Sequence, residues 1–233
     1  MSAPLHLAVF DVDGTLVDSQ HMIVQAMTQA MTDHGFDAPP PAAVRHIIGL
    51  SIADAVAALL PGVEPERVQA VADGYKAAYF ALRSSGTVTE TLFPGIADVL
   101  ARLDREGWLL GLATGKTRRG VESLLERHAV LSGRFLTRQT ADGNPSKPHP
   151  AMLQKAMAET GAEAPFTVMI GDTTYDMTMA RQAGTLALGV SWGYHSLQDL
   201  AAAGAHAIVD DVARLPEAIA GLTRSRPCVW PPS

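Results

Sequence analysis

Two aspartates, Asp11 and Asp13, stand two residues apart directly after an apolar run near the start of the chain. Side chains alternate between faces along a strand, so both carboxylates point to the same side, and Gly14 lets the chain turn sharply behind them. Two like charges roughly 5 Å apart repel by about 3 kcal/mol at an effective dielectric near 20. A cation or a proton must relieve this repulsion. Capping of a turn is the alternative role for the pair.

Three further segments place polar groups just beyond predicted strands, at the sheet edge where open α/β folds bind their ligands. Thr114 and Gly115 leave one strand and enter a helix, so a hydroxyl and backbone N–H groups can hold an anion there. Lys147 lies at the start of another helix. Asp172 and Asp176 follow the strand at 167–170 and are four residues apart, so they share one face if the helix begins there. Each segment alone fits an ordinary cap or surface charge, but together they favour a site.

Charge narrows the chemistry of this site. Ionised Asp11, Asp172 and Asp176 would carry −3, which a divalent cation and Lys147 would balance with +3, leaving a pocket that accepts phosphate. Ligands that are all oxygen suit Mg²⁺, and the eight histidines show no zinc-type spacing. One carboxylate can then attack phosphorus, while a second protonates the leaving oxygen and later activates water. Asp11 and Asp13 fill these two roles.

Short apolar runs separated by helical patterns predict an α/β fold with a doubly wound, mostly parallel, Rossmann-like sheet. The expected strands cover residues 5–10, 108–113, 167–170, 186–190 and 207–209, with a more polar run at 134–140 that suits an edge. The expected helices between them cover residues 96–106, 118–129, 148–160 and 174–183.

Residues 17–88 break this alternation, because they hold several helical patterns and no convincing strand. We expect an all-helical cap domain there, inserted after the first strand of an α/β core made of residues 1–16 and 89–233. Ser19 and Ser51 are expected to cap two of its helices. The insert should lie over the ligand-binding edge and act as a lid. Its polar candidates for contact with a leaving group are Arg45, His46, Tyr75, Lys76 and Arg83.

Composition limits the class of protein. The 233 residues are 47% hydrophobic and 18% charged with a net charge of −6, which disfavours a nucleic-acid partner. The single cysteine, Cys228, gives no disulfide framework. No apolar run resembles a signal peptide or a membrane span. We expect a cytoplasmic monomer or homodimer that acts on a small phosphorylated metabolite, with neither nucleic acid nor membrane as partner.

These motifs resemble those of the haloacid dehalogenase superfamily, specifically phosphatases with a C1-type helical cap such as phosphoglycolate phosphatases. The stretch DVDGTLVDS is similar to the first motif, and GDTTYD is similar to the fourth. Thr114 matches the hydroxyl of the second motif and Lys147 the lysine of the third. The resemblance implies Asp11 as nucleophile and Asp13 as acid and base, with the backbone carbonyl of Asp13 as a metal ligand.

The same resemblance implies Asp172 as a direct Mg²⁺ ligand and Asp176 as its support, directly or through water. Thr114, Gly115 and Lys147 would bind the phosphate. Gly115 stands where many relatives have Asn, so a backbone N–H is expected to replace a side-chain contact. Aspartate at position 13 disfavours dehalogenation.

The resulting prediction is Mg²⁺-dependent hydrolysis of small phosphate monoesters through an aspartyl-phosphate, with phosphoglycolate as the first compound to try. One alternative is another phosphoryl transfer on the same core, as in a sugar-phosphate mutase or a pyrophosphatase. The other alternative is a phosphate-binding module without catalysis.

Overall fold

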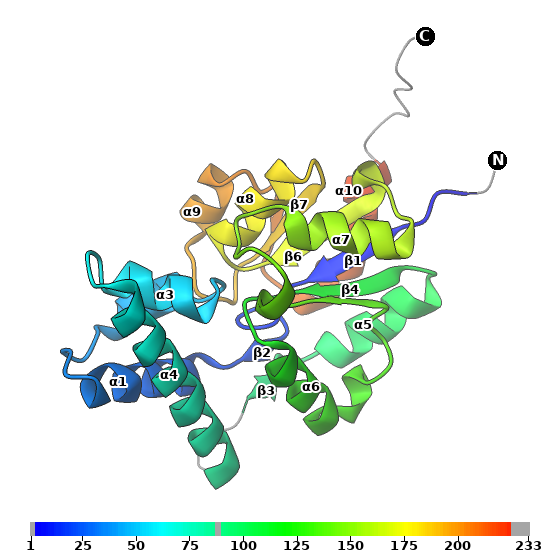
Figure 1. Ribbon diagram of the computed structural model, residues 1–233. Coiled ribbons are helices and arrows are strands. Elements are labelled where there is room, and N and C mark those ends of the chain that lie inside the picture. Colours follow the sequence, from blue (N-terminus) through cyan, green and yellow to red (C-terminus); the bar gives the residue numbers. More distant parts are fainter. Residues whose placement is uncertain (1–2, 87–89, 225–233) are drawn as a thin grey trace.

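A six-stranded parallel sheet forms the centre of the molecule, in the order β5-β4-β1-β6-β7-β8 (Figure 1). The computed structural model describes residues 3–86 and 90–224. All six predicted strands are present, and the most polar one lies at an edge, as expected. They are β1 (Leu7–Phe10), β4 (Leu109–Ala113), β5 (Thr137–Gln139), β6 (Thr167–Gly171), β7 (Leu186–Val190) and β8 (Ala207–Val209).

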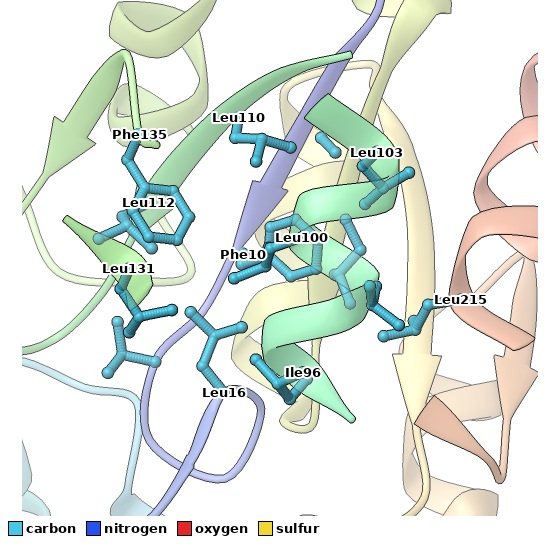
Figure 2. Close-up of a cluster of buried hydrophobic side chains, with 14 of the residues drawn as sticks. Phe10, Leu16, Ile96, Leu100, Leu103, Leu110, Leu112, Leu131, Phe135 and Leu215 are labelled. Carbon is cyan, nitrogen blue, oxygen red and sulfur yellow. The ribbon is translucent and has the colours of Figure 1, made fainter. Parts of the chain in front are cut away.

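Helices cover both faces of the sheet, which is why its strands are continuously apolar in sequence. Phe10 and Ile170 face one helical layer, and the neighbouring Val9 and Met169 face the other. The first layer contains α5 (Ile96–Arg105), α6 (Arg118–Arg127) and α10 (Leu215–Arg224). The second contains α7 (Ala151–Thr160), α8 (Thr174–Gln182) and α9 (Leu197–Ala202). Figure 2 shows α5 packed across the strands of the sheet in the first layer.

Four further helices lie to one side of the sheet and bury a hydrophobic cluster of their own (Figure 1). They are α1 (Gln20–Asp33), α2 (Pro41–Ile47), α3 (Ile52–Leu59) and α4 (Pro65–Ser85), and we call them the helical insert. Pro41 begins α2. Its ring fixes a helical φ, and the N–H that proline lacks would have had no partner in the first turn.

Two local expectations for residues 17–88 are wrong. Val17–Asp18 forms a short strand, β2, which pairs antiparallel with β3 (Thr91–Leu92). Two residues are too few to show an alternating pattern, so this strand could not be predicted from the sequence. Ser19 precedes α1 but its side chain accepts no helical N–H, because its hydroxyl donates to Asp13 instead. Ser51 does cap α3.

Four short 3₁₀ helices complete the described elements. They are η1 (Ala129–Leu131), η2 (Ala141–Gly143), η3 (Ala164–Phe166) and η4 (Val212–Arg214). Within residues 3–86 and 90–224, no helix combines the length and the hydropathy that crossing a bilayer requires. Cys228 lies outside the described residues.

Candidate active site

The predicted site residues come from the carboxyl ends of neighbouring strands. Phe10 of β1 is level with Leu112 of β4 and Ile170 of β6, so the chain leaves all three strands at one edge. Asp11 continues the pairing through its N–H, which donates to the Ile170 carbonyl at 2.9 Å. Thr114 follows β4 at this edge and is fully buried. The sheet therefore brings the motifs together as the sequence predicted.

Lys147 joins two of the aspartates from the turn before α7. Its Nζ lies 2.8 Å from Oδ1 of Asp11 and 2.6 Å from Oδ1 of Asp176. All three side chains are almost completely buried. Because a buried charge is costly unless it is paired, this ammonium is part of what makes the buried carboxylates tolerable.

Asp11, Asp172 and Asp176 form a compact carboxylate cluster, with one oxygen from each lying within 4.8 Å of the others. Asp172 is held by Thr15, whose hydroxyl donates to Oδ1 at 2.9 Å, and by the N–H of Tyr194, which donates to Oδ2 at 2.9 Å. The cluster therefore contains three of the four aspartates that the sequence singled out.

Asp172 and Asp176 do not share a helix face, because α8 begins only at Thr174. Asp172 lies before the helix, and Asp176 lies in its first turn. The Asp176 carboxylate accepts a hydrogen bond from the Thr173 hydroxyl at 2.7 Å and one from the Thr173 N–H at 3.2 Å. The second of these bonds completes a capping box. Asp176 thus both caps the helix and takes part in the site.

The electrostatics of the cluster suit a hard cation. Oδ2 of Asp11 is buried without a hydrogen-bond partner among the described residues. Burial raises the pKa of Asp11 to about 7, and the Lys147 ammonium only partly opposes it. Burial also raises the pKa of Asp172 well above its usual range. A cation bound between the three carboxylates would relieve their repulsion, so the residues present fit a bound metal ion.

Asp13 has a different environment from the cluster. Its Oδ1 accepts from the hydroxyl of Ser19 at 2.5 Å and lies 2.9 Å from Nζ of Lys116. These contacts come from groups that do not belong to the carboxylate cluster, so the two acids of the first motif have different surroundings. A metal contact through the Asp13 carbonyl stays a prediction.

Sequence reasoning missed a charged network around Lys116. Besides Asp13, its Nζ contacts Oε1 of Glu90 at 2.8 Å and the hydroxyl of Tyr79 in α4 at 3.1 Å. Arg127 pairs with the other Glu90 oxygen at 2.8 Å. Burial favours the neutral acid at Glu90, but Lys116, Tyr79 and Arg127 together outweigh it and lower its pKa to about 2. Nothing in the sequence near Glu90 indicated this long-range pairing.

Close packing shapes the loops around Asp172. Gly14 has a φ of +85°, and a Cβ there would lie 2.2 Å from Oδ2 of Asp172. The stretch 189–194 contributes the Tyr194 N–H to Asp172. It also contributes Trp192, whose indole N–H donates to the carbonyl of Thr15 at 3.2 Å. Thr15 belongs to the first motif, although the sequence assigned it no role.

A cavity of about 380 Å³ lies between the helical insert and the core, and Asp13 is part of its wall. Three of the polar candidates from the insert line it, namely Tyr75, Lys76 and Arg83. Arg45 and His46 do not line this cavity, and the ring of His46 stacks on His195 at 4.8 Å.

Gly115 lies at a close approach of the core to the insert. A Cβ at this position would lie 2.3 Å from the carbonyl oxygen of Leu50 and 2.8 Å from that of Gly49. Nearby, the Ser51 N–H donates to the Ser146 hydroxyl at 2.8 Å. The chain therefore has glycine, and no side chain, at the position that the loop before α3 approaches closely.

Comparison with known proteins agrees with this geometry. Residues 8–190 match the family described as haloacid dehalogenase-like hydrolase. The chain is 39% identical over 205 residues to the "Probable phosphatase IndB" of Dickeya dadantii (strain 3937), with 88% of this chain and 89% of that protein covered. It is 29% identical over 218 residues to a phosphoglycolate phosphatase of Synechococcus elongatus (strain ATCC 33912 / PCC 7942 / FACHB-805), with 93% and 98% covered.

Solved structures confirm the fold. A hydrolase from Pseudomonas syringae superposes with a TM-score of 0.81 at 23% identity, over 93% of this chain and 98% of that one. The family match covers most of the chain and includes the strands that carry Asp11, Thr114 and Asp172. The resemblance seen in the motifs is therefore confirmed, and the chain belongs to the haloacid dehalogenase-like hydrolases.

Proposed function

We propose that this protein is a Mg²⁺-dependent phosphatase that hydrolyses small phosphate monoesters through an aspartyl-phosphate. The observation that carries the proposal is the state of Asp11. One of its oxygens is fixed by Lys147, while the other is buried without a protein partner. Such an oxygen is positioned to attack a phosphorus atom. The names of the relatives, which include phosphatases, support the same reaction class.

In the first step, Oδ2 of Asp11 forms a bond to phosphorus as the bond from phosphorus to the ester oxygen breaks. Asp13 donates a proton to that oxygen, and the alcohol leaves. The Lys147 ammonium, the Thr114 hydroxyl and the Gly115 N–H bind phosphoryl oxygens. The Thr114 hydroxyl oxygen accepts from the Lys116 N–H at 3.2 Å, so its own proton can be donated. Bound Mg²⁺, held by Asp11 and Asp172 with Asp176 in support, would neutralise charge on the phosphoryl oxygens.

In the second step, Asp13 takes a proton from a water molecule, which attacks phosphorus and releases phosphate from Asp11. Asp13 is suited to both steps because it lines the cavity beside the insert, where the leaving group must lie. Ser19 and Lys116 hold its carboxylate in place. The cytoplasm is the location that we propose for this reaction, as a chain with one cysteine suits a reducing compartment.

The test is phosphate release from a panel of phosphorylated metabolites, phosphoglycolate among them, with Mg²⁺ or with EDTA. We expect release only with Mg²⁺, and a loss of at least about 10³-fold in kcat for Asp11→Asn, which lacks a nucleophilic oxygen. Asp98→Asn, an exposed aspartate of α5, is the matched control and should keep full activity.

Unchanged turnover in Asp11→Asn would contradict the assignment of the nucleophile. The fate of the phosphoryl group separates the remaining alternatives. Appearance of phosphate on a second hydroxyl compound would indicate a mutase. Tight binding of phosphate without turnover of any ester would indicate a binding module.

A further inference from the structure

The cavity beside Asp13 is large for the alcohol of a two-carbon ester. Its volume of about 380 Å³ falls in the range of pockets that bind ligands of drug size, which begins at roughly 300 Å³. Asp13 and Gly115 lie in its wall, so it adjoins the reaction centre. The leaving group of the substrate must therefore occupy this space.

Most of the wall is apolar and comes from the four helices of the insert. Ile23 and Met27 of α1, Ile52 of α3, and Tyr75 and Tyr79 of α4 all line the cavity. The rings of the two tyrosines lie 5.7 Å apart. Aliphatic and aromatic side chains bind a ring by burying its apolar surface. This wall suits a leaving group with a ring much better than a short polar one.

The two lysines that line the cavity are already paired. Lys116 contacts both Asp13 and Glu90, so two carboxylates balance its charge. Lys76 pairs with Asp73 at 2.8 Å. Within the described part of the wall, neither lysine offers an uncompensated charge to a carboxylate next to the phosphoryl group. A substrate of the phosphoglycolate type would find poor electrostatic recognition here.

Arg83 and Arg119 are different, because no carboxylate pairs with either of them among the described ion pairs. Both line the cavity, Arg83 from the insert and Arg119 from α6 of the core. Their guanidinium carbons lie 5.4 Å and 5.0 Å from the ring centroid of Phe80. Two guanidinium groups that converge on one ring form a positive site, and guanidinium is suited to bidentate binding of carboxylate or phosphate.

The order of side chains along α4 separates this positive site from the apolar wall. Tyr75, Tyr79 and Arg83 lie four residues apart and therefore share one face. Tyr79 contacts Lys116 beside Asp13, and Arg83 lies one turn further on, at roughly 6 Å along the helix axis. A leaving group that runs along this face meets aromatic side chains first and Arg83 last.

We propose that the substrate is a phosphate monoester of an alcohol that carries a ring and a second anionic group. The ring lies against the apolar wall of the insert, and Arg83 and Arg119 bind the second anion. This proposal rests on the phosphatase function proposed above. Because one arginine belongs to the insert and the other to the core, the same contact draws the two parts together over the substrate.

Three esters of the same primary-alcohol type test the proposal. They are ethyl phosphate, 2-phenylethyl phosphate and 4-(2-phosphooxyethyl)benzoate, which add first a ring and then a carboxylate. We expect kcat/KM to rise at least about tenfold with the ring and about tenfold again with the carboxylate. Phosphoglycolate should be a poorer substrate than 4-(2-phosphooxyethyl)benzoate. Equal kcat/KM for the first two esters, or a higher value for phosphoglycolate, would overturn the proposal.

Variants show which residues are responsible for each of the two rises in kcat/KM, called the increment from the ring and the increment from the carboxylate. Arg83→Gln and Arg119→Gln should each reduce the increment from the carboxylate by about fivefold or more, whereas Arg138→Gln, an exposed arginine of β5, should leave it unchanged. Ile52→Ser should reduce the increment from the ring about threefold. Leu59→Ser is its control, because Leu59 is a partly exposed residue of the same helix that does not line the cavity. Increments that change equally in test and control variants would contradict the assignment.

A binding measurement keeps this inference separate from the proposed function. In the phosphonates propylphosphonate, 3-phenylpropylphosphonate and 4-(3-phosphonopropyl)benzoate a methylene replaces the ester oxygen, so they cannot be hydrolysed. Calorimetry with Mg²⁺ present should show the same two increments in affinity, and Arg83→Gln should remove the second. If no ester releases phosphate but the affinities still rise in this order, the proposed function fails while the inference stands. Equal affinities for all three phosphonates would overturn the inference.

Discussion

Asp11 shows how one buried side chain can be both restrained and reactive. Lys147 holds one oxygen, while burial raises the pKa of the carboxyl group despite the nearby ammonium. The consequence for the folded protein depends on pH. The pKa rises from 3.8 to about 7 on folding, so the folded state binds more protons than the unfolded state over this range. Without metal, the contribution of Asp11 to stability therefore decreases as pH rises from 3.8 to about 7.

The first prediction at this scale concerns Mg²⁺ and pH. Mg²⁺ must compete with the proton on Asp11 below about pH 7, so it should raise the melting temperature more at pH 8 than at pH 5. Thermal unfolding with and without Mg²⁺ at both pH values measures the difference. Asp172→Asn should lose most of the gain, whereas Asp98→Asn should keep it. An equal gain at both pH values would count against Asp11 as a ligand.

Among elements, the network of Glu90 connects helices and loops that are far apart in the sequence. Tyr79 belongs to α4 of the insert, Lys116 follows β4, and Arg127 ends α6. All three meet at one carboxylate, which is almost completely buried. The position of α4 over the core is therefore coupled to the residues that hold Asp13.

A prediction about stability follows for Glu90. Its folded pKa of about 2 lies below the usual 4.5, so its stabilising effect is complete above pH 4.5 and is lost as pH falls toward 2. Glu90→Gln should lower the free energy of unfolding near pH 7 by on the order of 3 kcal/mol. Urea unfolding between pH 7 and pH 3 should show the gap between variant and parent narrowing below pH 4.5. A gap independent of pH would contradict the ionised network.

The elements also show what the sequence could and could not reveal. Continuous apolar runs identified five of the six strands of the sheet, because burial on both faces leaves a pattern within the run itself, whereas the edge strand β5 is polar. The two residues of β2 carry no such pattern. Ser19 has the composition of a cap, but its hydroxyl bonds to Asp13. Local propensity cannot reveal that another group competes for the Ser19 hydroxyl. Asp13 becomes such a group only once the loop after β1 has folded.

The same limit applies to the candidate site. Motif residues at strand ends could be placed together, because parallel topology makes all those ends meet at one edge. The partners of Lys116 could not be predicted, since Glu90 and Tyr79 reach it through tertiary packing of the insert. Arg119 likewise gave no sequence signal, because its relation to Arg83 exists only where α4 passes over α6.

At the scale of the whole molecule, the insert and the core each bury their own hydrophobic cluster and meet through a few polar contacts. These include the stack of His46 on His195, the bond from Ser51 to Ser146, and the approach of Leu50 to Gly115. Among the described residues, no hydrophobic cluster spans both parts beyond the contact of Tyr194 with the insert, so the boundary between them is mostly polar. Relative motion of the insert is therefore a natural way to admit substrate.

Gly115→Ala tests this arrangement. The new methyl would meet the Leu50 carbonyl at 2.3 Å, and backbone cannot give way as a flexible side chain can, so the loop before α3 must move away. We expect KM to rise and hydrogen exchange at the Ser51 N–H to become about tenfold faster, while the melting temperature stays nearly constant.

Gly143→Ala is the control for this change, because nothing lies within 4 Å of a Cβ at that position. It should alter neither KM nor exchange at Ser51. Unchanged exchange in Gly115→Ala would contradict the closeness of the insert to the core at this point.

Trp192 gives the protein a built-in optical reporter. Its indole N–H donates to Thr15, whose hydroxyl in turn donates to Asp172. Any event that shifts the carboxylate of Asp172 therefore reaches the chromophore through two hydrogen bonds. Titration with Mg²⁺ should change tryptophan emission, and Trp192→Phe should abolish that signal while leaving the fluorescence of the remaining indoles in place.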